Sequence, residues 1–227
     1  MFIGHYGPAF IVATRPRAPR LAWLFVAAQL IDFGFFALTI LGIEHLRLVP
    51  GTTAMNPMDL YSMPYTHSLV GALLWAAGFA GVLWYVWRDR ETALIGAIIV
   101  LSHWVIDLIV HAPDLTLWGS PPKFGLGLWN HPLIEMPLEL FFAFGGFAWY
   151  LRRTRATSRR SRGAVWALGI AMAGLQAFNW FAPQPDTIID PVPVSTGLLG
   201  LFAYTLLAGL AWWVAANRTA KLGTTTY

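Results

Sequence analysis

One apolar stretch of the chain carries two histidines and an aspartate at four-residue intervals, His103, Asp107 and His111. In an α-helix this spacing advances by about 40° per step, so the three side chains lie on one face. Imidazole and carboxylate groups one turn apart can ligate one metal ion, or the carboxylate can accept a hydrogen bond from a metal-bound histidine. A buried His and Asp can also simply satisfy each other. The spacing therefore indicates a metal site, with a structural pair as the alternative.

Further candidate residues lie in or beside apolar stretches, where ionisable groups are rare. They are His5, Asp32, His67, Asp114, Glu135 and Glu139. An Asp near the centre of a membrane helix costs roughly 2.5 to 3.5 kcal/mol on insertion scales, so Asp32 and Asp107 need partners, a cation or water. The chain has no Cys, which leaves His and carboxylates as its metal ligands.

The composition is that of an integral membrane protein, because 57% of the 227 residues are hydrophobic and only 11% are charged. A soluble domain carries roughly 25% charged residues. We expect one all-α domain over residues 1–227, a polytopic bundle of six transmembrane helices. The predicted spans are 21–43, 66–87, 92–112, 132–151, 164–182 and 195–216. Residues 1–14 are apolar but too short to span, and predict a short re-entrant or interfacial N-terminal helix.

Basic residues predict the orientation of these spans. Thirteen of the fifteen Lys and Arg fall before the first span, between later spans on one side, or after the last span; only Arg47 and Lys123 lie on the other side. Cytoplasmic loops retain positive charge, so both termini are expected in the cytoplasm. The net charge of +4 is then an orientation signal. The expected partner is the lipid bilayer, with no nucleic acid.

Depth can be predicted from the distance along each helix to the cytoplasmic charges. At about 1.5 Å per residue, His5, Asp32, His103 and Glu139 lie roughly 15 to 20 Å into the bilayer. Asp107 and Glu135 are expected about one turn further out, and His67 and His111 about two turns above His103. His45 and His131 are expected to be solvated in outer loops. The fifth and sixth spans are expected to be scaffold.

In their order, these residues resemble a family of membrane-bound metal-dependent hydrolases of bacterial inner membranes. The resemblance covers about residues 1–130 and rests on Ile3-Gly4-His5-Tyr6, Leu30-Ile31-Asp32, Thr66-His67-Ser68 and the pair His103 and Asp107. His111 and Asp114 look like features of a subgroup. The stretch 31–34 lacks the second carboxylate of many relatives, and 62–65 stands where a His-Arg-Gly often occurs.

The resemblance implies a divalent metal ion, zinc or manganese, in a bacterial inner membrane. The implied ligands are His5, Asp32, His67, His103 and Asp107, with His111, Asp114 and Glu135 as further candidates. A bound metal brings the pKa of its water toward about 7, which suits attack on an ester, phosphoester or amide. Asp107 would orient a ligand or act as general base, and Glu139 is the alternative base.

This reasoning predicts a hydrolase that acts at the outer side of the membrane, on a substrate that is a lipid or another amphipathic molecule. Three alternatives remain open. The same His and carboxylate groups would suit a proton-coupled transporter or channel. A structural metal in a non-catalytic protein is the second alternative. Haem bound by His67 and His111, or by His103 and His5, is the third, although no haem is expected.

Overall fold

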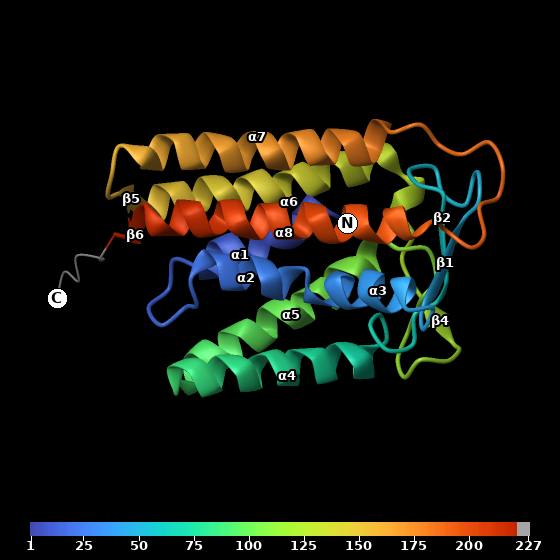
Figure 1. The fold of residues 1–227 in the computed structure, drawn as a ribbon, viewed down its shortest axis with the longest axis horizontal. Helices are drawn as coiled ribbons and strands as arrows, with labels where there is room; N and C mark the ends of the chain where they lie inside the picture. The colour runs from blue at the N-terminus through green and yellow to red at the C-terminus, as the bar shows by residue number, and fades with distance from the viewer. Residues whose placement is uncertain (222–227) are drawn as a thin grey trace.

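The computed structural model describes residues 1–221, which form a mostly helical bundle (Figure 1). Its helices are η1 (Ile3–His5), α1 (Tyr6–Val12), α2 (Leu21–Ala28), α3 (Leu30–Ile40), α4 (Leu69–Trp87), α5 (Arg90–Val110), η2 (Leu128–Asn130), α6 (Pro132–Arg153), α7 (Arg160–Phe181) and α8 (Val194–Ala216). Helices α6, α7 and α8 run along one side of the bundle, α4 and α5 along the other, and α1 and α2 lie between them.

Short strands connect the helices at both ends of the bundle. They are β1 (His45–Leu48), β2 (Met58–Ser62), β3 (Leu115–Thr116), β4 (Lys123–Phe124), β5 (Thr154–Ala156) and β6 (Arg218–Ala220). They pair as three two-stranded antiparallel sheets, β1 with β2, β3 with β4 and β5 with β6. Segments 44–65 and 113–131, which lie between predicted spans, therefore contain hairpins. We call the end that carries β1 and β2 the hairpin end of the bundle (Figure 1).

Helices long and apolar enough to cross a membrane are present within residues 1–221, which supports the predicted membrane class. Four qualify singly, namely α4, α5, α7 and α8, and the bent pair α2 and α3 brings the number to five if it counts as one span. Helix α6 has 22 residues but contains two Glu and ends in two Arg, and it is not among these candidates. The sixth span and the orientation of the termini stay predictions.

The predicted span 21–43 is not one continuous helix. It breaks at Gln29 into α2 and α3, whose axes differ by 53°. The break leaves the carbonyl of Ala28 at the C-terminus of α2, where helix carbonyls lack intrahelical partners. It also places Asp32 in the first turn of α3, where the helix dipole favours a negative charge. Irregular backbone of this kind is tolerated in a membrane protein when other protein covers it.

At the end of the bundle opposite the hairpin end, side-chain hydrogen bonds fix the ends of the helices. Asp89 caps α5 by accepting from the backbone N–H of Thr92 at 3.2 Å and from its hydroxyl at 2.7 Å, and these hydrogen bonds lower the pKa of Asp89. Arg218 of β6 donates to the hydroxyl and carbonyl oxygens of Thr154 at 2.8 and 3.0 Å. Arg218, which we counted as an orientation signal, thus also joins the ends of α6 and α8.

The N-terminal segment is packed inside the bundle through glycines. Ile3, Gly4 and His5 of η1 are buried, and so are most residues of α1. A Cβ on Gly146 of α6 would lie 2.7 Å from the carbonyl oxygen of Gly7, and a Cβ on Gly7 would lie 2.6 Å from the carbonyl oxygen of Phe142. Small residues allow two helix backbones to approach this closely. The contact sets the position of His5, which directly precedes α1.

We expect Gly146→Ala to lower the melting temperature of the purified protein, because overpacking typically costs about 1 to 3 kcal/mol. Gly145→Ala is the matched control, because a Cβ there meets its nearest neighbour only at 3.9 Å. Gly145→Ala should leave the melting temperature unchanged or raise it, since Ala favours helix by up to about 1 kcal/mol over Gly. Equal melting temperatures for the two variants would contradict the close contact of α1 with α6.

Candidate metal centre

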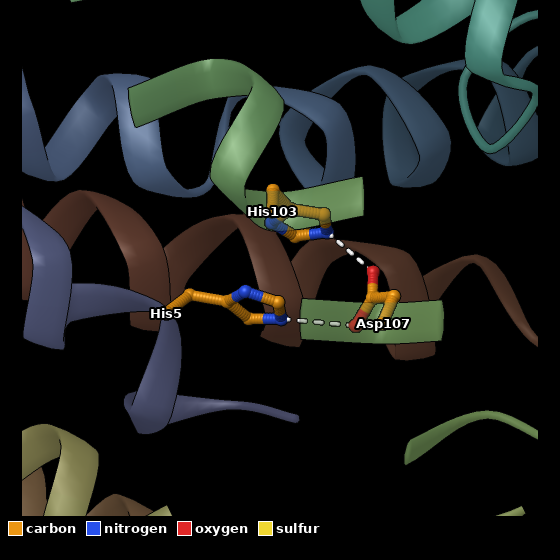
Figure 2. A group of neighbouring side chains, drawn as sticks. All are labelled: His5, His103 and Asp107. Atoms are coloured by element: carbon orange, nitrogen blue, oxygen red, sulfur yellow. Dashed lines mark ion pairs between the residues drawn. The ribbon is translucent and has the colours of Figure 1, made fainter. Parts of the chain in front are cut away.

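Asp107 of α5 lies at the centre of a buried cluster of imidazole rings. Its Oδ1 is 3.0 Å from Nε2 of His5, and its Oδ2 is 2.9 Å from Nε2 of His103 (Figure 2). Nε2 of His111 lies 3.3 Å from Oδ1, and Nε2 of His67 lies 3.7 Å from Oδ2. The side chain of Asp107 is only 2% exposed. Four histidines from separate places in the chain therefore face one carboxylate.

Asp32 adds a second carboxylate to this cluster. Its Oδ1 lies 3.4 Å from Nε2 of His67 and 3.5 Å from Nε2 of His103. Its Oδ2 accepts a hydrogen bond of 2.9 Å from the hydroxyl of Tyr204 in α8. The side chain of Asp32 is 16% exposed, whereas that of His103 is fully buried. Asp32 thus forms the more open side of the cluster.

The other ring nitrogens show which atoms of the histidines can bind a cation. Nδ1 of His103 lies 2.7 Å from the carbonyl oxygen of Ala28. A carbonyl oxygen only accepts, so Nδ1 of His103 carries a proton, and in the neutral ring Nε2 then has the free lone pair. Nδ1 of His111 lies 2.9 Å from Oδ1 of Asp114, which leaves Nε2 of His111 free in the same way. Metal-binding histidines typically have this arrangement, with one nitrogen donating to an oxygen and the other facing the metal.

His67 is oriented through a relay. The hydroxyl of Thr66 donates to Oε2 of Glu44 at 2.6 Å, so its oxygen can accept from Nδ1 of His67 at 2.9 Å. Glu44 is fully buried and also accepts from the backbone N–H groups of Tyr65 and Thr66 at 2.8 and 3.0 Å. The relay leaves Nε2 of His67 free to face Asp32 and Asp107. Ser68 caps α4 by accepting from the N–H of Gly71 at 2.9 Å.

Oδ1 of Asp107 accepts a hydrogen bond of 3.3 Å from the amino group of Met1, but three other atoms of the cluster have no such partner within the described part of the chain. Nε2 of His5, Nε2 of His103 and Oδ2 of Asp107 are buried without a hydrogen-bond partner among residues 1–221, despite the short distances. Buried polar atoms without partners are uncommon and costly. A cation among them would satisfy all three, so the donor set fits a metal ion.

Two groups of three residues have their ligand atoms within 4.8 Å of one another, His5 with His103 and Asp107, and Asp32 with His67 and His103. Nε2 of His103 has one lone pair, and Nδ1 is engaged with Ala28. The two groups can therefore not both be complete at once. This sharing favours a single ion that uses His103.

The segment that contains His5 is held by the carboxylate of Glu139, which is itself fixed by Gln176. Oε1 of Glu139 accepts from the backbone N–H groups of Phe2 and Gly4, the latter at 3.1 Å, and its Oε2 accepts from Nε2 of Gln176 at 3.0 Å. These contacts favour an anchoring role for Glu139, and its role as a base stays a prediction.

The same segment is fixed against the broken helix. Gln29, at the break between α2 and α3, donates to the carbonyl of Phe2 at 2.9 Å. The ring of His5 stacks on that of His103, with centroids 3.8 Å apart and planes 9° from parallel. The break at Gln29 therefore helps to position both histidines.

Two expectations about the site are wrong. His67 was expected about two turns above His103, but the centroids of the two rings lie only 5.8 Å apart. His111 does follow His103 by two turns, yet its Nε2 reaches to within 3.3 Å of Oδ1 of Asp107. His67 precedes α4 in a turn that enters the bundle, and His111 caps α5 and points back along it. The fifth and sixth predicted spans are also more than scaffold, because Gln176 of α7 and Tyr204 of α8 bond to Glu139 and Asp32.

A cavity of about 320 Å³ begins at this cluster. Asp32, His67, Asp107 and His111 line its polar part, together with Glu135 and Glu139. Glu135 is fully buried, and neither of its carboxyl oxygens has a hydrogen-bond partner among the described residues. His131 is exposed, as expected for an outer-loop residue. The candidate ligands thus face a space that could admit a small molecule.

In comparisons with protein-family models, curated proteins and solved structures, the chain matches none of them. The resemblance to membrane-bound hydrolases therefore stays a prediction. Function has to be inferred from the site itself, because a fold alone does not define an activity.

We expect Thr66→Val to weaken metal binding by about 10- to 100-fold, the usual effect of losing a group that orients a metal-bound histidine. The change removes the hydroxyl that links Glu44 to His67 and keeps the shape of the side chain. Competition with a fluorescent chelator would measure the affinity. The matched control is Thr39→Val, because the Thr39 hydroxyl has no partner within residues 1–221. Equal affinities for the two variants would contradict a role for the relay.

Proposed function

We propose that this protein is a membrane-embedded, metal-dependent hydrolase of ester, phosphoester or amide bonds, acting at the outer side of a bacterial inner membrane. One observation carries the proposal. The Nε2 atoms of four histidines face Asp107 at the wall of a cavity, and those of His5 and His103 have no hydrogen-bond partner among the described residues.

His5, His103 and Asp107 would hold the ion, with Asp32 and His67 on its more open side. Imidazole nitrogen and carboxylate oxygen ligands suit zinc or manganese. A bound ion of this type supplies a Lewis acid and a water whose pKa is near 7. The chain holds three of these residues in place, His103 through Ala28, His67 through Thr66 and Asp32 through Tyr204.

The carboxylates take different roles in this proposal. Asp107 either binds the ion or accepts a proton from the attacking water, because its Oδ2 is free of hydrogen bonds within the described residues. Glu139 keeps the N-terminal segment in place. Glu135 has no hydrogen-bond partner among the described residues and lines the cavity, so it is well placed to donate a proton to a leaving group.

The cavity favours this proposal over a purely structural metal. A structural zinc site is closed, with all four positions taken by protein, whereas a catalytic site keeps one position for water or substrate. Here Asp32, His67, Asp107 and His111 all line the cavity. An ion held by His5, His103 and Asp107 would be closed on the side of His5 and His103, which do not line the cavity, and open on the side of Asp32 and His67. A proton-coupled transporter remains the alternative that flux in liposomes would reveal.

We expect the purified protein to hydrolyse at least one of three probes, a p-nitrophenyl ester, bis(p-nitrophenyl) phosphate or an acyl p-nitroanilide. A chelator should abolish the hydrolysis, and zinc or manganese should restore it. Asp107→Asn should lower the rate by about 100-fold or more, the typical effect of losing a general base or a ligand.

Asp59→Asn is the control, because Asp59 lies in β2 and pairs with Arg47 at 2.7 Å, away from the cluster. This variant should retain the rate of the unchanged protein. Full activity of Asp107→Asn would contradict the proposal. So would proton flux through liposomes by metal-free protein that hydrolyses none of the probes.

A further inference from the structure

Besides the polar residues of the cluster, the cavity is lined by apolar side chains from α3, α7 and α8, which we call its apolar part. The apolar part is lined by Phe35, Phe36, Leu175, Phe178, Leu199 and Ala203. Small-molecule pockets span roughly 300 to 1,000 Å³, so a cavity of about 320 Å³ is at the small end of that range. Its size suits one hydrocarbon chain better than two.

Two residues of the apolar part are half-exposed on helices that could cross the membrane. Phe178 of α7 and Leu199 of α8 both line the cavity, yet they are 56% and 50% exposed. Helices α7 and α8 are both candidate membrane spans. Their exposed apolar faces would then contact lipid, so a hydrocarbon chain could enter without passing through water.

From this lining we infer that the apolar part binds the single hydrocarbon chain of an amphiphilic substrate, whose scissile bond lies at the metal cluster. The inference rests on the proposed function and names its substrate class. A hydrocarbon chain that moves from lipid into the apolar part loses little free energy. The polar group of the substrate, in contrast, requires polar partners such as Asp32 and Glu135. The boundary between the two parts therefore places the bond where the chain meets the polar group.

Ala203 lies at this boundary. The next residue, Tyr204, donates to Asp32, and Ala203 itself lines the cavity with a small side chain. One turn earlier in α8, a Cβ on Gly200 would lie 2.6 Å from the ring of Phe36, so α3 and α8 are in close contact there. A bound chain therefore passes over Ala203, and a bulky residue at this position would block the apolar part beside an unchanged cluster.

Two hydroxamates test the inference, because the same metal-binding group can carry a short or a long chain. Binding of acetohydroxamate and octanohydroxamate to the metal-loaded protein would be measured by calorimetry in one detergent. Ala203→Trp should weaken the binding of octanohydroxamate by about tenfold or more, because the variant would prevent the burial of at least two methylene groups of its chain. It should change the affinity for acetohydroxamate by no more than about twofold, the range of a neutral substitution.

Ala173→Trp is the matched control, since Ala173 is exposed on α7 and does not line the cavity. It should change neither affinity. Phe178→Ala is a second variant that widens the apolar part at a half-exposed position, and it should shift the preference toward chains longer than octanoyl.

The outcomes separate the inference from the function on which it rests. Failure of both hydroxamates to bind the unchanged protein would contradict the proposed metal site, and the inference would fall with it. Binding of acetohydroxamate together with equal effects of Ala203→Trp on both probes would overturn the inference alone. So would a chain-length preference that neither Ala203→Trp nor Phe178→Ala alters.

Discussion

A carboxylate enclosed in an apolar bundle has to be neutralised, and Asp107 imposes this requirement on the whole structure. Its side chain is 2% exposed, and an unpaired buried charge costs several kcal/mol. Its partners come from four places, namely the N-terminal segment, the turn before α4, the preceding turn of α5 and the residue that caps α5. One partner is the amino group of Met1, 3.3 Å from Oδ1 of Asp107, and the others are histidines, each of which can be a cation itself or can share a cation with the carboxylate. This is why segments far apart in the chain meet at one point.

The surrounding fold serves to hold these rings in place. The break at Gln29 supplies the Ala28 carbonyl that orients His103, and the side chain of Gln29 bonds to the segment that carries His5. Glu139 anchors that segment from α6, and Tyr204 holds Asp32 from α8. Inside a bundle of low dielectric, such hydrogen bonds are strong and unpaired groups are costly, so the network is well ordered when complete. The irregularities of the fold, a broken helix and a short buried N-terminal helix, lie where the site requires them.

Much of the site could be predicted from the sequence because it depends on local periodicity and on the cost of a charge in an apolar segment. The spacing of His103, Asp107 and His111 defines one helix face, and Asp32 stands out in its apolar surroundings. Glu44 could not be found in this way, because nothing local shows that its loop turns back into the bundle. Tyr204 resembles any aromatic residue of a membrane helix. The break at Gln29 has no Pro or Gly to mark it, and the depth of His67 was misjudged because it lies in a turn rather than a helix.

X-ray absorption at the metal K edge of the purified protein, recorded beside His103→Ala, would show whether Asp107 and its histidines hold a metal ion. We expect about one divalent ion per chain, with nitrogen and oxygen ligands at roughly 2.0 to 2.2 Å and the scattering pattern of several imidazole rings. His103→Ala should lose the ion, because the two candidate ligand groups share that residue. Protein that contains no stoichiometric metal when purified without chelator, or an ion without imidazole ligands, would rule out a metal centre at Asp107.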